Sequence, residues 1–374
     1  MWSGLALRRI TTAVTAAARL LADGDTDGAG RAYAKALAKA RKQIGRAPAA
    51  TGLAATAHIG VGRVHLARRD FAAADPEFLA AQQLQPHEWA GYYWAGCAAA
   101  HRSDFHRADW FFTTALATGQ APARTFQQRG FARIRLGQVD AAVADLDTAA
   151  AHRALDDNAL VVLAALHLHR RDWARAEAAL IAIPDDRRQP ATDGMLGSAL
   201  ERQGRNEAAI AAYDLAVASG DRAPAVLFHQ GLVAYRLGRF ADSARAWTEL
   251  CQRHPHGASY RRLVARAEYA AARQLIDAGR FGAALPRLVA GIDAQPAGTL
   301  DTSFAQLHRY AAAEAADAGD RDRARSLLTA ARDDPWARDF RILLDRLDGN
   351  TQAAEREWNR INSEQAANPR TLFA

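Results

Sequence analysis

A cysteine and two histidines lie within six residues of one another about two-thirds of the way along the chain. Cys251, His254 and His256 carry the thiol and imidazole groups that bind zinc, but Pro255 stiffens the segment between the histidines and no fourth ligand is visible. A histidine pair at the C-terminus of a helix explains the same residues, because that end of a helix favours positive charge. The sequence therefore predicts no metal site and no cofactor.

Two other histidine arrangements have spacings that bear on chemistry. Cys97 and His101 are four residues apart, which places them on one face of a helix, as a thiol nucleophile and its base would need. Nothing in the sequence supplies an oxyanion hole for such a pair. His167 and His169 are two residues apart and face different sides of a helix, so they do not form a helical metal pair. We expect no enzymatic activity.

Adjacent carboxylates occur at Asp185 and Asp186, in the segment PDDRRQP. Proline at both ends marks this segment as a turn, and acidic groups at the start of a helix are favourable without any catalytic role. The sequence holds no phosphate-binding G-x-x-x-x-G-K-[ST] loop, no G-x-G-x-x-G on a strand, no H-E-x-x-H and no paired C-x-x-C.

The elements that would position these groups follow a repeating pattern. A small residue recurs in steps of 34, 34, 34, 33 and 34 residues at Gly62, Gly96, Gly130, Ala164, Gly197 and Gly231. A second small residue follows 12 positions later in each unit, at Ala74, Ala108, Ala142, Ala176, Ala209 and Ser243. A large apolar residue comes four positions after that, at Phe78, Phe112, Leu146, Leu180, Tyr213 and Trp247. Small residues let two helices cross closely, and the large residue fills the remaining gap.

Glycine marks the middle of three units, at Gly137, Gly204 and Gly238, where it can end a helix with a positive φ. A large apolar residue follows two positions later in five of the six units, at Phe71, Phe105, Val139, Trp173 and Phe240. The pattern weakens at both ends of the chain but persists around Gly24 and Tyr33, and again after Gly279, Gly319 and Gly349.

This spacing resembles that of the tetratricopeptide repeat, a helix-turn-helix unit of about 34 residues that stacks on its neighbours. The resemblance implies an all-α protein, a right-handed α-solenoid. We expect a degenerate helical pair and loop over residues 1–52, a regular array of about six repeats over 53–256, and divergent repeats with a tail over 257–374. Within the first segment we expect helices over 3–22 and 31–44, a turn over 23–30 and a loop over 45–52.

The net charge is +7, and arginine supplies nearly all of the positive charge. Acidic residues are interleaved with the arginines, which is typical of a solvated helical surface. The two cysteines fall in different units, which favours a reducing interior over a disulfide, and no apolar run approaches the roughly 18 residues that span a bilayer. We expect a cytoplasmic protein whose first helix packs on the first repeat; a membrane-surface anchor is the alternative for that helix.

In the family that the sequence resembles, the first helix of each unit lines a concave groove. The resemblance places in this groove the residues that we expect to bind a partner, which are Arg63, Tyr93, Trp94, His101, Gln127, Phe131, Arg135, His169, Phe228, Tyr235, Arg236, Tyr269, Arg273 and Arg309. Aromatic and arginine side chains together are typical of binding hot spots. The groove should therefore prefer a segment with apolar anchors and acidic groups. The lysine and asparagine with which some family members hold a C-terminal carboxylate are replaced here by Ile59 and Arg63.

The sequence thus predicts a protein-interaction scaffold or adaptor. Its alanine- and arginine-rich, lysine-poor composition indicates a bacterial source, and the resemblance implies a sensing or docking subunit of a signalling, defence, secretion or assembly system. The alternative function is nucleic-acid binding along the arginine and aromatic face.

Overall fold

The computed structural model describes residues 2–255, 258–278, 281–294 and 322, and over these residues it contains helices and turns but no strand. The chain divides into two compact units, Met1–Arg187 (unit 1) and Arg188–Ala374 (unit 2). The predicted all-α solenoid is confirmed. The division into segments 1–52, 53–256 and 257–374 rests on how regular the repeats are in the sequence, and it stays a prediction.

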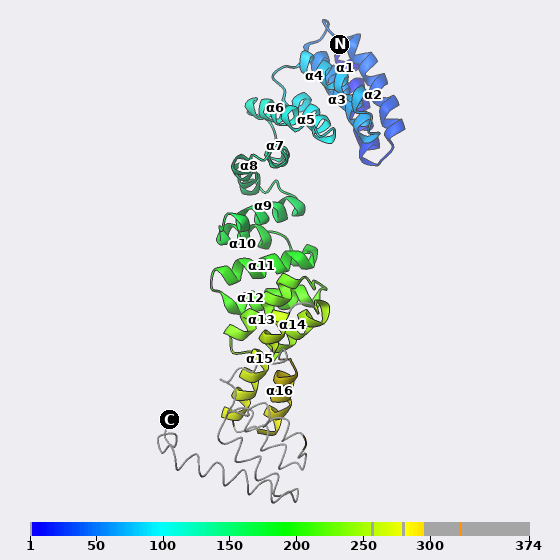
Figure 1. Cartoon of the computed structure of the whole chain (residues 1–374). Helices are drawn as coiled ribbons and strands as arrows, with labels where there is room; N and C mark the ends of the chain where they lie inside the picture. The colour runs from blue at the N-terminus through cyan, green and yellow to red at the C-terminus, as the bar shows by residue number, and fades with distance from the viewer. Residues whose placement is uncertain (1, 256–257, 279–280, 295–321, 323–374) are drawn as a thin grey trace, which may run out of the picture. The chain divides into compact units, whose positions relative to one another are not determined.

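Unit 1 is a series of helices in which each packs against the next along the chain (Figure 1). The helices are α1 (Trp2–Ala22), α2 (Thr26–Arg41), α3 (Pro48–Ala67), α4 (Phe71–Leu84), α5 (Trp89–His101), α6 (Phe105–Ala117), α7 (Arg124–Arg135), α8 (Val139–Ala151), α9 (Asp157–His169) and α10 (Trp173–Ile181). A short 3-10 helix, Asp185–Arg187, ends the unit at the acidic turn that the sequence predicts.

The described part of unit 2 follows the same plan. Its helices are α11 (Pro190–Arg202), α12 (Asn206–Ala218), α13 (Pro224–Arg236), α14 (Phe240–Arg253), α15 (Ala258–Asp277) and α16 (Phe281–Ala294). The helix expected after Gly279 is α16, whereas the repeats expected around Gly319 and Gly349 lie outside the described residues.

Two expectations near the N-terminus are wrong in detail. The predicted turn over 23–30 is mostly helix, because Asp25 caps α2 by accepting a hydrogen bond from the Gly28 N–H at 2.7 Å. The predicted loop over 45–52 ends at Pro48, which begins α3. Proline suits the first helical position, where its missing N–H costs no hydrogen bond.

A glycine under a bulky side chain sets the contact between the two helices of most units. A Cβ atom added at Gly62 would lie 2.5 Å from Phe78, one at Gly96 would lie 2.7 Å from Phe112, and one at Gly130 would lie 3.0 Å from Leu146. All the predicted large residues of the six units are buried, and so are the small residues four positions before them. In the one unit with alanine in place of the glycine, Ala164 and the large residue Leu180 are both fully buried.

In all six units, the turn between the two helices has a left-handed residue at the same position, with φ between 59° and 76°. The residues are Arg69, Ser103, Gly137, Arg171, Gly204 and Gly238. Where this residue is not glycine, the next one is an aspartate that caps the following helix, at Asp70, Asp104 and Asp172. Where it is glycine, the next residue is Gln138, Arg205 or Arg239, and its side chain makes no capping bond. Each turn therefore has either a glycine, which adopts the positive φ without strain, or an aspartate that caps the next helix.

The glycine contact predicts unequal costs for the same substitution. Gly62→Ala should lower the free energy of unfolding of unit 1 by about 1–3 kcal/mol, because the new methyl group overlaps the Phe78 ring. Gly130→Ala should be close to neutral, since Leu146 can adjust and alanine favours the helix by about 1 kcal/mol. Urea denaturation followed by circular dichroism measures both, and equal losses in the two variants would contradict this account.

The turns predict a stabilising substitution. Gln138→Asp should add the missing cap beside Gly137 and stabilise α8 by about 1 kcal/mol, whereas Asp172→Ala should destabilise α10 by a similar amount. Hydrogen exchange of the amides in the first turns of α8 and α10 measures each effect locally. If the α8 amides of Gln138→Asp protein exchange as fast as those of the original protein, the missing cap does not limit the stability of α8.

Candidate functional site

A hollow of about 620 Å³ lies in unit 1, between side chains of α1, α3, α5 and the start of α7. Its lining mixes aromatic, apolar and cationic groups and contains no acidic residue; it consists of Leu21, Arg63, Leu66, Ala67, Trp89, Tyr93, Trp94, Cys97, His101, Pro122, Arg124 and Gln128. Four of the residues expected to contact a partner thus come together here: Arg63, Tyr93, Trp94 and His101.

Aromatic rings of α5 form one wall of the hollow. The Tyr93 ring lies 5.8 Å from that of Trp89 and 5.2 Å from that of Trp94, both edge-on, and it also contacts the Phe112 ring of α6. Tyr93 is 7% exposed, whereas Trp94 is half-buried. Of this adjacent pair, Trp94 therefore offers more surface to a ligand, and Tyr93 supports it from the core.

Two polar groups of α5 in the hollow, the Tyr93 hydroxyl and the Cys97 thiol, are uncharged at neutral pH. Burial raises the pKa of Tyr93 to about 12, and the neighbouring Cys97 adds to the increase. Burial also raises the pKa of the Cys97 thiol to about 12, against the opposing effects of a hydrogen bond from Tyr93 and the charge of Arg124. A neutral thiol is a poor nucleophile, so the Cys97 and His101 pair does not have the electrostatics of a catalytic cysteine.

The two arginines of the hollow differ from their neighbours in having no carboxylate partner. The Arg63 guanidinium lies over the Trp94 ring, 4.5 Å from its centroid, and Arg124 is exposed at the start of α7. Among the described residues, neither forms an ion pair. By contrast, Arg102 contacts Asp75 at 2.7 Å, Arg129 contacts Asp145 at 2.7 Å, and Arg133 contacts Asp109 at 2.7 Å.

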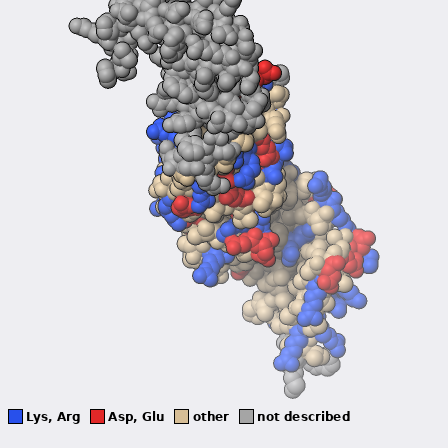
Figure 2. Space-filling view, turned by 90° about the horizontal axis from the view of Figure 1, so that it is seen from below, with Lys and Arg blue, Asp and Glu red and all other residues tan. Residues whose placement is uncertain are grey.

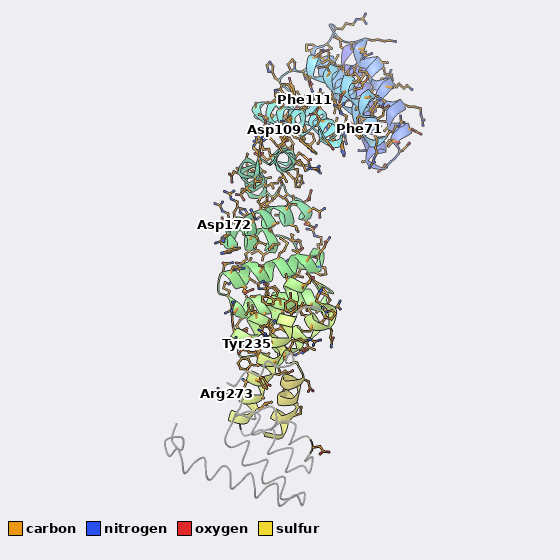
Figure 3. All side chains as sticks on the ribbon, in the orientation of Figure 1. Phe71, Asp109, Phe111, Asp172, Tyr235 and Arg273 are labelled. Atoms are coloured by element: carbon orange, nitrogen blue, oxygen red, sulfur yellow. The ribbon has the colours of Figure 1, made fainter. Side chains whose placement is uncertain are left out.

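His101 and Arg135 also join neighbouring repeats. The His101 ring stacks on Phe71 at 5.8 Å, and the Arg135 guanidinium lies 4.6 Å from the centroid of the Phe105 ring. Phe71, which Figure 3 labels at the start of α4, and Phe105 occupy the large position after the turn in successive units. The sequence spacing predicted that these two positions carry large side chains. It did not predict that His101 and Arg135, at the end of the first helix of the next repeat, pack on them.

Two residues expected in the groove are buried instead. Gln127 is 2% exposed, and its Nε2 donates a hydrogen bond to Asp156 at 2.6 Å, while Tyr269 is 0% exposed. Neither has surface for a partner, which corrects the expectation for both. In unit 1, Phe131 is half-buried and His169 is exposed. Arg309 lies outside the described residues.

Unit 2 carries a second group of aromatic and cationic side chains. Tyr235, labelled in Figure 3, contacts Arg266, whose Nε donates a hydrogen bond to the Tyr235 hydroxyl at 3.3 Å and whose guanidinium lies 5.5 Å from the ring centroid. Phe228 is half-buried, with its ring 6.5 Å from that of Tyr260. Arg273 is exposed and takes part in a contact within the chain.

Arg236 belongs to a polar cluster around a buried glutamate. Its Nη1 donates a hydrogen bond to Glu201 Oε1 at 2.9 Å, and the Tyr213 hydroxyl donates to Oε2 at 3.1 Å. His229 Nδ1 lies 2.9 Å from the same Oε2. Burial alone would raise the pKa of Glu201, but His229, Tyr213 and Arg236 outweigh it and hold this pKa below its usual value. The carboxylate is therefore charged and matched within the core, so Arg236 is only partly free for a partner.

The remaining candidates for chemistry have structural explanations. His167 is buried with its Nε2 2.9 Å from Asp147, while His169 is exposed, so the two do face different sides of α9. Cys251 and His254 are described but His256 is not, and no group of three potential metal ligands occurs among the described residues. The described helices include none that is long and apolar enough to cross a membrane.

Charge on the described surface is mixed. On the face shown in Figure 2, basic side chains are interspersed with acidic ones. Among the described residues, ion pairs join neighbouring repeats, such as Arg170 with Asp140 and Arg239 with Glu207. Much of the arginine charge is thus paired locally, as the sequence predicts.

Comparison with known proteins supports the repeat family. The family model described as tetratricopeptide repeat matches residues 194–226 and 228–273. No curated protein matches the chain. Among solved structures, a tetratricopeptide repeat protein from Parabacteroides merdae is 13% identical, with 69% of this chain and 98% of that chain covered and a TM-score of 0.40.

Two further solved structures show similar likeness. PilF of Pseudomonas aeruginosa is 18% identical (56% and 96% covered, TM-score 0.41), and yeast Tom70 is 16% identical (78% and 60% covered, TM-score 0.37). At these TM-scores the likenesses say nothing about function. The family model thus matches part of unit 2, and helix-turn-helix units with the same glycine contacts recur through the described residues of both units.

Proposed function

We propose that this protein is an interaction scaffold that binds a segment of a partner protein in the hollow of unit 1. Tetratricopeptide repeats support a general role in protein binding. The observation that carries the proposal is the lining of the hollow, in which Trp89, Tyr93 and Trp94 lie beside Arg63 and Arg124 without any carboxylate. Aromatic and arginine side chains in a recess are the residue types that dominate binding energy at interfaces.

The bound segment should combine apolar and acidic side chains. The half-buried Trp94 ring offers apolar contact, and the two unpaired guanidinium groups attract negative charge. Phe131, Arg135 and His169 lie on the first helices of the next repeats and would extend the contact. Phe228, Tyr235, Arg236 and Arg273 are proposed as a separate contact region on unit 2, to which Arg309 is assigned from the sequence.

The proposed biological setting rests on composition and on the resemblance to the repeat family. The alanine- and arginine-rich composition supports a bacterial source, and the resemblance supports a sensing or docking subunit of a multi-protein system. Nucleic-acid binding has less support, because Arg102, Arg129 and Arg133 are matched by carboxylates rather than left to form a basic stripe.

Peptides selected from a random display library on the full-length protein can test the hollow. Such a peptide should lose affinity by about 2 kcal/mol with Trp94→Ala and be rejected by Arg63→Glu, as measured by isothermal titration calorimetry. Trp110→Ala and Arg31→Glu are matched controls, because both residues are exposed and lie outside the hollow. Loss of affinity in the controls but not in the hollow variants would reject this site.

A further inference from the structure

The hollow of unit 1 holds more positive charge than the described residues neutralise. Arg63 and Arg124 line it from α3 and α7, and neither has a carboxylate partner among the described residues. Arg63 and Arg124 line the same hollow as the Tyr93 side chain, and the Arg63 guanidinium lies 4.5 Å from the centroid of the Trp94 ring. His101 adds a third group that can carry positive charge. Nothing acidic in the lining offsets these groups.

Elsewhere in the same unit, two guanidinium groups meet with a carboxylate between them. Asp145 is buried and accepts hydrogen bonds from Arg129 Nε at 2.9 Å and Nη2 at 2.7 Å, and from Arg133 Nη1 at 2.9 Å, while Arg133 is further balanced by Asp109. The lining of the hollow contains no aspartate or glutamate that could lie between Arg63 and Arg124 as Asp145 lies between Arg129 and Arg133. A ligand that occupies the hollow faces two positive charges, and a group with a single negative charge leaves one of them unmatched.

Neutral hydrogen-bond donors lie beside this unmatched charge. The hydroxyl of Tyr93 and the thiol of Cys97 both keep their protons at neutral pH, because burial raises the pKa of each to about 12. They therefore add donors to the hollow without adding negative charge. The Trp94 ring, which one guanidinium already covers, provides an apolar surface for the residue that carries or precedes the anion.

We propose that the hollow recognises a phosphorylated side chain on the partner segment, held between Arg63 and Arg124 and flanked by an apolar residue against Trp94. This inference rests on the proposed function and specifies its ligand. A phosphate monoester carries a charge of about −1.5 to −2 at pH 7 and offers three acceptor oxygens, which matches two guanidinium groups better than a carboxylate does. Guanidinium groups bind phosphate in a bidentate manner, so lysine should not replace them fully.

Small probes test the charge preference directly. Phenyl phosphate and benzoate present the same ring with a dianion or a monoanion, and phenol presents no charge. Titrated into the full-length protein and followed by ligand-observed NMR, phenyl phosphate should bind roughly tenfold more tightly than benzoate. Arg63→Gln and Arg124→Gln should each remove most of this difference, and Arg31→Gln, an exposed arginine outside the hollow, should keep it. Equal binding of phenyl phosphate and benzoate would overturn the proposal.

Peptides then separate this inference from the function on which it rests. Degenerate peptide libraries with a fixed central phosphoserine, phosphothreonine, phosphotyrosine or glutamate are passed over immobilised protein. Retention of the phosphorylated libraries alone, lost in Arg63→Gln protein, supports the proposal. If the glutamate library is retained as well as the phosphorylated libraries, and Arg63→Gln protein retains none of them, the phosphate preference is overturned but the binding hollow is supported. If the peptides are retained equally by the original protein, Arg63→Gln protein and Arg124→Gln protein, both the phosphate preference and the binding hollow are rejected. Both are also rejected if single-stranded RNA displaces the peptides and the two arginine variants bind the peptides as well as the original protein does.

Discussion

The close contact between a glycine on one helix and a large side chain on the next is the constraint on which the repeats depend. At Gly62 and Gly96 a phenylalanine ring lies directly over the glycine, so the helices approach as closely as the ring allows. Because the ring is buried completely, the contact removes much apolar surface from water with few residues. Other faces of the same helices are then available to present side chains such as Trp94 and Arg63 in a fixed relation.

Charge in this protein has two separate uses. Where an arginine and a carboxylate meet between helices, as at Arg129 and Asp145, the pair is largely buried and joins α7 to α8. Removal of either partner would leave a buried charge without compensation, so such residues serve the fold. The arginines of the hollow are different because no carboxylate of the described residues pairs with them. The charge of Arg63 lies next to the half-buried Trp94 ring, where a ligand can reach both groups.

The repeat spacing was sufficient to predict the helices, their pairing and the buried large residues, because each of these depends on contacts within about 20 positions of the chain. The binding residues were predicted less well. Gln127 occupies a groove position by spacing, but it is buried by a hydrogen bond to Asp156, 29 residues away. Arg124 was not among the predicted residues, although it lies in the same unit as Gln127 and six positions before Gly130. The partners of His101 and Arg135 in the preceding repeat also depend on helix tilt, which spacing does not determine.

The turns show how stability is distributed along such an array. A left-handed residue other than glycine, such as Arg171, is strained, and the aspartate after it compensates through the helix cap; a glycine at that position needs no such compensation. The two residues therefore act together, since a strained backbone occurs only where a cap follows it in the six described turns. Because neither kind of turn combines a strained backbone with a missing cap, we expect thermal opening to be shared among these six units rather than to begin at one turn.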